Sequence, residues 1–358
     1  MTVSRSLTGA VLALAVGLPV AGCGTTSRPQ ATTRPRHRPA IRATASATSG
    51  GPRATGREGV PGFAHVFLIV GENTSASEVT PARAPYLTGT LKPRAAWLTN
   101  YHALTDGSLG NYAAMVSGQF VRCEANNDFS FANGDVPSQH ACHQGVANVF
   151  HQFDQANISW QEWNESAANP CDIFDHGGTW AHNSYAAHHN PALYFDDIQA
   201  HHGSEDVTPS AECVAKDLPM GTTAANDTSA WDNALAAGKV ARFNLIIPNN
   251  CESGHDPCGA SPQRQFDDFL RREIPKIEAS PAYGSDGTII ITWDEGDDPP
   301  YDPEHVILAA LGQSVKAGTY GGARLTHYSL LRTIEDGFGL PQHLAKAAKA
   351  RPISQIWH

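Results

Sequence analysis

One serine stands where nucleophilic chemistry is possible. The polar turn Thr105-Asp106-Gly107-Ser108 comes just before an apolar run over residues 112–116 that has the character of a helix. A hydroxyl at the start of a helix lies among unpaired backbone N–H groups, which would also stabilise an incoming oxyanion. The turn therefore makes Ser108 a candidate nucleophile. Serine is also a common N-cap residue, so the turn by itself fits a structural role as well.

Two acidic clusters form the second candidate group. Their members are Glu72, Asn73, Asp294 and Glu295. The clusters directly follow the apolar runs 64–70 and 288–293, which are typical of strands buried on both faces of a parallel sheet. Carboxylates at the edge of a buried sheet are costly unless they are paired or bound to a metal. Together the clusters predict a site for a divalent metal ion, whereas either cluster alone could be a solvated loop end.

Alternating apolar and amphipathic segments position these residues. Strands are expected at 64–70, 95–98, 158–163, 241–248, 288–293 and 305–311. Helices are expected after Ser108 and at 146–155, 262–277 and 328–338. This alternation predicts an α/β fold, a three-layer sandwich with a mostly parallel central sheet. A long polar segment rich in His and Asn, from about 164 to 228, is expected to be an insertion in that sheet.

The first 60 residues have a different character from the rest. Residues 1–22 have the charged start, short apolar core and small final residues of an export signal. Its end, Val20-Ala21-Gly22-Cys23, resembles a bacterial lipobox, which implies that Cys23 carries a lipid anchor at the extracytoplasmic face of the membrane. Plain secretion is the alternative. Residues 23–60 have almost no large apolar side chains and predict a disordered tether, which leaves 61–358 as the catalytic domain.

Charge and cysteine content narrow the classes of protein to which the chain can belong. Residues 59–358 hold 17 Lys and Arg against 34 Asp and Glu, a net charge of −17, so nucleic acid is not an expected partner. Six cysteines remain besides Cys23, and an even number in an exported chain predicts three disulfides. Sequential pairing would join Cys123 to Cys142, Cys171 to Cys213 and Cys251 to Cys258. No CxxC spacing supports zinc binding instead.

A set of short motifs occurs in a recognisable order. The motifs are Glu72-Asn73, Ser108-Leu109-Gly110-Asn111-Tyr112, His189-Asn190-Pro191, Gly254-His255-Asp256, Thr292-Trp293-Asp294-Glu295-Gly296 and His327-Tyr328-Ser329-Leu330-Leu331. In this order they resemble the phosphoesterase family of bacterial acid phosphatases and phospholipases C, within the alkaline phosphatase-like superfamily. The resemblance covers roughly residues 64–340.

The resemblance implies a mechanism for phosphate ester substrates. Ser108 would attack phosphorus and form a phosphoserine, and the two acidic clusters would hold the divalent metal ion. His255 would bind phosphate or protonate the leaving group. Asn111, His189 and His327 would contact the substrate, although an amide in this turn and a buried histidine both have structural roles elsewhere.

The chain departs from the family pattern at two places. Asp106 and Gly107 stand where the family usually has His-Pro, and Gly110 replaces a second proline, so the turn before the helix is freer. Ser253 stands where an aspartate is usual, and the loss of that carboxylate is expected to weaken metal affinity or alter substrate choice unless Glu252 or Asp256 reaches into the site.

Three other functions compete with the phosphatase assignment. The first is a phospholipase C-type phosphodiesterase. The second is a metal-free GDSL-like serine esterase, because Asp302-Pro303-Glu304-His305 has the Asp-x-x-His form that completes a triad. The third is a non-catalytic surface lipoprotein that keeps only the fold. The sequence leaves the metal, the oligomeric state and the choice among phosphomonoester, phospholipid and nucleotide open.

Overall fold

The computed structural model describes residues 56–119, 144–178, 180–199, 208–297 and 300–358. The predicted export signal, the anchor residue Cys23 and most of the predicted tether lie outside these residues, as does the predicted pair Cys123 and Cys142. Among the described residues, none of the helices has the length and apolar character needed to cross a membrane.

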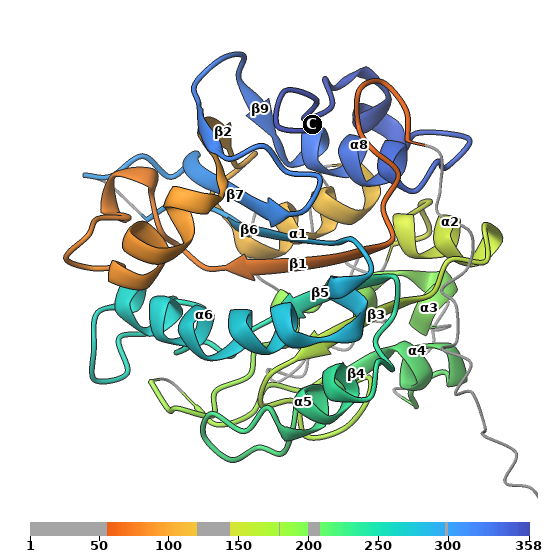
Figure 1. Ribbon diagram of the computed structural model, residues 1–358. Helices are drawn as coiled ribbons and strands as arrows, with labels where there is room; N and C mark the ends of the chain where they lie inside the picture. Colours follow the sequence, from red (N-terminus) through yellow and green to blue (C-terminus); the bar gives the residue numbers. More distant parts are fainter. Residues whose placement is uncertain (1–55, 120–143, 179, 200–207, 298–299) are drawn as a thin grey trace, which may run out of the picture. The chain divides into compact units, whose positions relative to one another are not determined.

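One sheet of nine strands forms the centre of the described domain (Figure 1). The strands are β1 (His65–Gly71), β2 (Ala96–His102), β3 (Trp160–Asn164), β4 (Asp217–Pro219), β5 (Phe243–Ile247), β6 (Gly287–Trp293), β7 (His305–Gly312), β8 (Gly318–Tyr320) and β9 (Leu325–Thr326). Their order across the sheet is β4-β3-β5-β1-β6-β7-β2-β8, and β9 also pairs with β2. All six predicted strands are present, and the short strands β4, β8 and β9 are additional.

The central strand β1 explains why the two acidic clusters meet. It pairs in parallel with β5 on one side and β6 on the other, in a register that places Gly71 beside Trp293. The residues that follow these two strands therefore leave the sheet at the same edge. The strand β7 runs antiparallel to β6 and to β2, so the sheet is mostly parallel, as expected.

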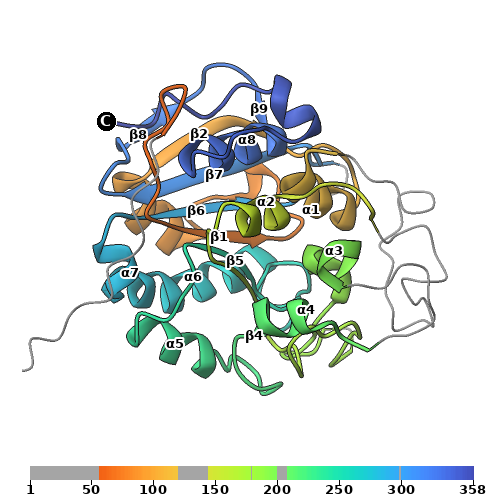
Figure 2. The same ribbon diagram turned by 90° about the vertical axis from the view of Figure 1, so that its right-hand side faces the viewer.

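Helices cover both faces of the sheet. The α-helices are α1 (Ser108–Ser117), α2 (Val149–Gln155), α3 (Asp196–Gln199), α4 (Ala211–Lys216), α5 (Ser229–Ala236), α6 (Pro262–Ala279), α7 (Pro281–Gly284) and α8 (His327–Gly337). Figure 2 shows α1, α2 and α8 on one side of the strands and α5, α6 and α7 on the other. The longest, α6, buries Phe266, Phe269 and Ile277 along one face, the spacing of an amphipathic helix. The predicted three-layer sandwich is confirmed.

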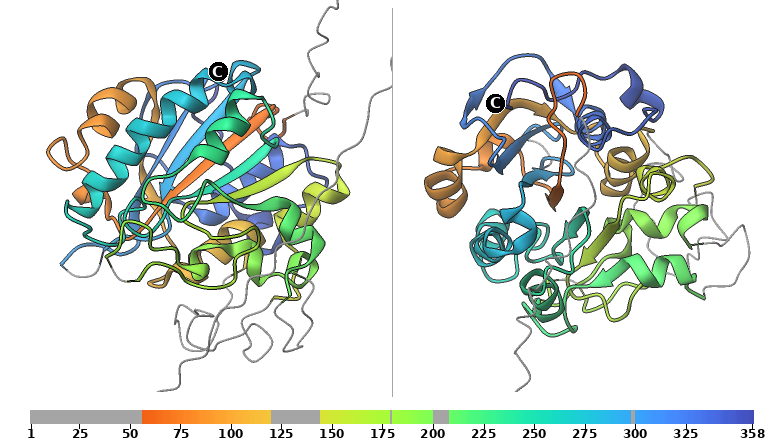
Figure 3. Two further views of the ribbon diagram at one scale, coloured as in Figure 1. Left: turned by 90° about the horizontal axis from the view of Figure 1, so that it is seen from below. Right: turned by 45° about the vertical axis from the view of Figure 1, so that its right-hand side comes forward.

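The polar insertion has more structure than its composition suggests. It contains α3, α4 and β4 together with two 3₁₀-helices, η6 (Ala187–His189) and η7 (Pro191–Tyr194). Of these segments, η6 and η7 pack against α1, and α4 packs against β3 and β4; all of them are yellow-green to green in Figure 3. A disulfide between Cys171 and Cys213, with Cα atoms 5.4 Å apart, closes the insertion. This pair and the second disulfide, Cys251 to Cys258, confirm two of the three predicted pairings.

Candidate functional site

The carboxyl ends of β1 and β6 bring Glu72 and Asp294 together. Both side chains are fully buried. The Asp294 N–H donates to the carbonyl of Gly71 at 3.0 Å, and the Asn73 N–H approaches Asp294 Oδ1 at 3.4 Å. The chain turns sharply here, because Asn73 adopts a φ of 35°. The first cluster is therefore held directly against the second, as their positions after adjacent parallel strands predict.

Helix α1 presents two hydroxyls to Glu72. The Ser108 hydroxyl donates to Glu72 Oε2 at 3.0 Å, and the Tyr112 hydroxyl donates to Oε1. Residues four apart lie on one face of a helix, so the two donors reach the same carboxylate. The N-cap is Gly107 and not Ser108, which excludes the interpretation of Ser108 as the cap. The sequence motifs predicted no role for Tyr112, although its spacing of four residues from Ser108 indicates that the two side chains share a face of the helix.

The turn before α1 is organised by Glu295 and Asn111. Glu295 accepts hydrogen bonds from the Gly107 N–H and, at 3.0 Å, from the Asn111 amide. The same amide donates to the Thr105 carbonyl at 3.0 Å, and its oxygen accepts from the Leu104 N–H at 3.0 Å. Gly107 has a φ of 138°, a conformation that other residues rarely adopt. The family departure at this position thus coincides with a backbone geometry that suits glycine, and the role of Asn111 toward substrate stays a prediction.

The four proposed metal ligands suit a cation in their chemistry. Burial, followed by the neighbouring charge of Asp294, raises the pKa of Glu72 well above its usual range. Across the described residues, the buried Oδ1 of Asn73 has no hydrogen-bond partner. Carboxylates that repel one another, together with an amide oxygen that has no hydrogen-bond partner, are the kind of oxygen ligands that a hard divalent ion binds.

The carboxylates are nevertheless not gathered into a closed metal cage. In the part of the chain that the structure describes, the trio of acidic, His or Cys ligand atoms lying within 4.8 Å of one another is Cys171, Cys213 and Asp217. Its two sulfurs form a disulfide, so that trio is not a thiolate metal site. Binding of one ion by all four proposed residues would therefore draw their oxygens closer together.

His189 lies on the other side of Glu72 from Ser108. Its Nε2 is 3.5 Å from Glu72 Oε1, and its ring stacks on Tyr112 with centroids 5.7 Å apart. Burial, with smaller contributions from His188 and His255, holds the pKa of His189 well below its usual range. His189 is therefore neutral at ordinary pH, and one ring nitrogen can donate a hydrogen bond while the other accepts one.

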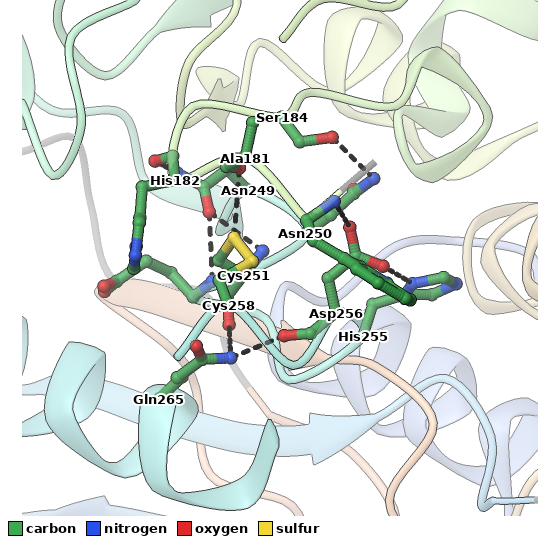
Figure 4. Close-up of a disulfide and its surroundings, with 12 residues drawn as sticks. Ala181, His182, Ser184, Asn249, Asn250, Cys251, His255, Asp256, Cys258 and Gln265 are labelled. Atoms are coloured by element: carbon green, nitrogen blue, oxygen red, sulfur yellow. Dashed lines mark hydrogen bonds and ion pairs between the residues drawn. A yellow bond between two sulfur atoms is a disulfide. The ribbon is translucent and has the colours of Figure 1, made fainter. Parts of the chain in front are cut away.

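His255 is carried by a short loop between β5 and α6 that the second disulfide closes (Figure 4). Its Nδ1 pairs with Asp256 at 2.9 Å, and its side chain is about one-third exposed. Gln265 of α6 donates hydrogen bonds to the carbonyls of Cys251 and Asp256 at 3.0 and 2.6 Å, and these two bonds hold the loop against α6. Burial acts to raise the pKa of Asp256, but hydrogen bonds from His255 and the Trp180 N–H outweigh it and lower that pKa.

A polar cleft of about 490 Å³ opens beside His255. Its lining includes Asp175, His176, Ser184, His188, Asn250 and Asp256. The His255 ring is 5.7 Å from the ring of His189, which in turn reaches Glu72. A path of polar side chains therefore connects the cleft with the buried acidic residues.

His327 supports the site from the far side of β6. Its Nε2 contacts the Asp294 carbonyl at 2.6 Å and its Nδ1 contacts the Tyr101 hydroxyl at 2.9 Å. Complete burial lowers its pKa to about 4. Both ring nitrogens have protein partners here, so His327 fixes the backbone that carries Asp294, and its contact with substrate stays a prediction.

The second family departure leaves a small hydroxyl near the ligands. Ser253 donates to the Asn250 carbonyl at 3.2 Å, and its own carbonyl accepts from the Glu72 N–H at 2.9 Å. Glu252 pairs with Arg272 of α6 at 2.9 Å, and Asp256 pairs with His255. Each of these two carboxylates therefore has a partner outside the proposed ligand set.

Comparisons with known proteins support the family resemblance that the sequence motifs indicate. The sequence profile of the Phosphoesterase family matches residues 80–341. A probable acid phosphatase of Kluyveromyces lactis is 26% identical over 86% of this chain and 65% of that protein. A phosphatidylinositol-3-phosphatase of Mycobacterium tuberculosis is 24% identical over 83% of this chain and 84% of that protein. An acid phosphatase of Aspergillus fumigatus is 26% identical over 68% of this chain and 48% of that protein.

The chain thus spans only about half to two-thirds of the two fungal relatives. Among solved structures, a protein in the alkaline phosphatase superfamily from Vibrio parahaemolyticus superimposes with a TM-score of 0.50 at 10% identity. The match covers 86% of this chain and 71% of that one. At that identity the match concerns the fold, and the fold is alkaline phosphatase-like.

Proposed function

The chain belongs to the phosphoesterase family, and on this premise we propose that it is a phosphoric ester hydrolase that cleaves monoesters in the manner of an acid phosphatase. The observation that carries the proposal is the contact of the Ser108 hydroxyl with Glu72 at 3.0 Å, at the first residue of a helix. Relatives named acid phosphatases support the same class of substrate.

In the proposed first step, Ser108 Oγ forms a bond to phosphorus while the bond from phosphorus to the ester oxygen breaks. The serine proton faces Glu72, so the oxygen lone pairs are directed away from that carboxylate. Ser108 is the first residue of α1, and the start of a helix favours negative charge such as that of the phosphoryl oxygens. Water then hydrolyses the phosphoserine and restores the free hydroxyl.

Glu72, Asn73, Asp294 and Glu295 are the residues proposed to hold a divalent metal ion. The buried, unpartnered Oδ1 of Asn73 and the elevated pKa of Glu72 support this assignment. When bound, such an ion lowers the pKa of a serine hydroxyl and neutralises phosphate oxygens. Asn111 keeps Glu295 in place, and His327 keeps the backbone of Asp294 in place.

His255 is the proposed donor of a proton to the leaving alkoxide. Asp256 holds its Nδ1, and the side chain that carries the ring is about one-third exposed. A proton on Nε2 would pass to the ester oxygen as the phosphorus–oxygen bond breaks. Neutral His189, between this ring and Glu72, is the proposed hydrogen-bond donor to a phosphoryl oxygen.

The contacts of Ser108 argue against the serine esterase alternative. An esterase serine bonds to a histidine base, whereas Ser108 bonds to a carboxylate. His305, the histidine of the Asp-x-x-His segment, has its Nε2 on the Thr99 carbonyl at 2.8 Å. The presence of Ser108 and of all four proposed metal ligands also argues against a non-catalytic lipoprotein.

A hydrolysis screen tests the proposal. The substrates are p-nitrophenyl phosphate, bis-p-nitrophenyl phosphate, phosphatidylcholine and a p-nitrophenyl acyl ester, each with and without chelator. We expect the monoester to be cleaved fastest, with activity lost on chelation and restored by divalent ions. Faster cleavage of the diester or of phosphatidylcholine would move the assignment to a phospholipase C-type enzyme. Chelator-resistant cleavage of the acyl ester would replace it with the esterase.

Export with a lipid anchor on Cys23 is the proposed location. The two disulfides support an oxidising compartment outside the cytoplasm. Wild-type protein should partition into detergent, whereas a Cys23→Ala variant should stay in the aqueous phase. Equal partitioning of the two proteins would contradict the anchor and leave plain secretion.

A further inference from the structure

A second group of buried polar side chains lies along β3 and at the start of β4, apart from the proposed metal ligands. It consists of Glu162, Asn164, Asp217 and Asn190, all at most 2% exposed. Glu162 is the register partner of Asp217 in the parallel pair, so both side chains point to the same face of the sheet. The amides of Asn164 and Asn190 donate to the two oxygens of Asp217 at 2.7 and 2.9 Å.

Three oxygens of this cluster have no protein partner. Among the residues that the structure describes, Glu162 Oε1, Asn164 Oδ1 and Asn190 Oδ1 are buried and accept no hydrogen bond. The other Glu162 oxygen accepts from the Ala192 N–H at 3.3 Å. A buried acceptor without a donor costs about 1–3 kcal/mol. Three such acceptors beside two carboxylates therefore indicate a missing hydrogen-bond donor or cation.

A second acidic cluster shows how buried carboxylates in this protein are neutralised by an arginine. Glu165 is also fully buried and lies near Glu252 and Glu273, but Arg272 reaches all three carboxylates at 2.9–3.5 Å. The charges that act most strongly on Glu162 and Asp217 are instead those of other carboxylates. The chain thus supplies a cation to one cluster, whereas Glu162 and Asp217 accept hydrogen bonds from neutral donors, namely the Ala192 N–H and the amides of Asn164 and Asn190.

We propose that Glu162, Asp217, Asn164 and Asn190 bind a divalent cation of the calcium type, separate from the ion at Ser108. Two carboxylates and two amide oxygens offer a charge of −2 and oxygen ligands alone, which suits a hard ion. Calcium tolerates irregular cages built from protein oxygens, whereas magnesium retains several waters. A soft metal is excluded because the neighbouring sulfurs of Cys171 and Cys213 form a disulfide.

The bound ion would have a structural consequence for the catalytic site. It would join β3, β4 and the segment after η6, which carries Asn190. The preceding residue is His189, whose ring lies against Tyr112 and Glu72. Calcium bound to Asn190 would therefore hold the neighbouring His189 in position without itself contacting the substrate.

The test uses the mature protein in an Asp294→Asn background, which weakens the proposed catalytic metal site. After chelation, the protein is dialysed against CaCl₂ and its calcium content is measured by mass spectrometry. We expect one calcium ion retained per chain. We also expect Tm to rise by roughly 5 °C when free calcium is about 100 times its Kd.

Two further variants in the same background locate the ion. Asp217→Asn should lose the retained calcium and the rise in Tm, whereas Glu165→Gln, a matched buried carboxylate that already has Arg272, should keep both. Glu162→Gln provides the same test if Asp217→Asn does not fold. No retained calcium in the background protein, or retention unchanged by Asp217→Asn and Glu162→Gln, would overturn the proposal and assign the cluster a shared proton.

Discussion

Replacement of Asn111 by alanine separates two roles for this residue. Its side chain is completely buried and makes hydrogen bonds to the Leu104 N–H, the Thr105 carbonyl and Glu295, each at 3.0 Å. If Asn111 holds the turn before α1, Asn111→Ala should destabilise the fold and displace Ser108. If it only binds substrate, stability should hardly change.

The expected magnitude follows from these contacts. Two neutral hydrogen bonds are worth about 1 kcal/mol each, and the bond to a carboxylate about 1.5–3 kcal/mol, so the free energy of unfolding should fall by roughly 3–5 kcal/mol. A domain of this size loses about 2 °C in Tm per kcal/mol, which gives a drop of roughly 6–10 °C. The apparent affinity for divalent metal should also fall, because Glu295 loses a donor that orients it.

Denaturant unfolding and a metal titration measure both effects in one protein preparation. Asn111→Asp is the matched control, since it keeps the shape and the oxygen that accepts from the Leu104 N–H but replaces the amide donor with a carboxylate beside Glu295. It should also be destabilised, through charge repulsion. A loss below about 1 kcal/mol in Asn111→Ala, together with a large rise in KM, would refute the structural role and leave Asn111 as a substrate ligand.

Three other perturbations have definite expected outcomes. Removing the disulfide across the 7-residue separation with Cys251→Ser/Cys258→Ser should cost about 2.4 kcal/mol, and removing the one across 42 residues with Cys171→Ser/Cys213→Ser about 4 kcal/mol. The first variant should nevertheless lose more kcat, because its loop carries His255; the reverse ranking in kcat would contradict that role. Asp294→Asn should lose activity that excess divalent ion partly restores, and an absence of rescue would argue against its role as a ligand. Burial raises the pKa of Asp217 to about 7 and of Glu165 to about 8, so the folded state binds more protons than the unfolded state, and the Tm of chelated protein should rise as pH falls from 8 to about 6.5. A flat or falling Tm in that window would show that these carboxyls are ionised in the fold.

The sequence predicted the central sheet well because its strands are long and apolar. The runs that became β1 and β6 are buried along nearly their whole length, so their type and the meeting of Glu72 with Asp294 followed from sheet geometry. The three-residue strand β4 escaped detection. It begins with Asp217 and ends with Pro219, and its place in the sheet comes from pairing with β3.

Side-chain partners were harder to predict than positions. Sequence motifs placed Asn111, His189 and His327 near the site, but the hydrogen bonds of Asn111 to the turn and of His327 to the backbone of Asp294 are visible only in the folded structure. Contacts of this kind depend on loops whose path no periodicity describes. The cluster of Glu162 and Asp217 could not be predicted for the same reason, because Asp217 lies in the polar insertion and meets Glu162 only through the pairing of β3 with β4.

The phosphoserine itself provides the most direct measurement. Protein mixed with p-nitrophenyl phosphate and divalent ion is quenched in acid during turnover, digested and analysed by mass spectrometry. A phosphate group on Ser108, absent without substrate, is the predicted result, and Ser108→Ala should lose turnover by several orders of magnitude at every metal concentration while keeping its fold. Near-wild-type turnover by Ser108→Ala, or phosphate found on another residue, would contradict the assignment of Ser108 as the nucleophile.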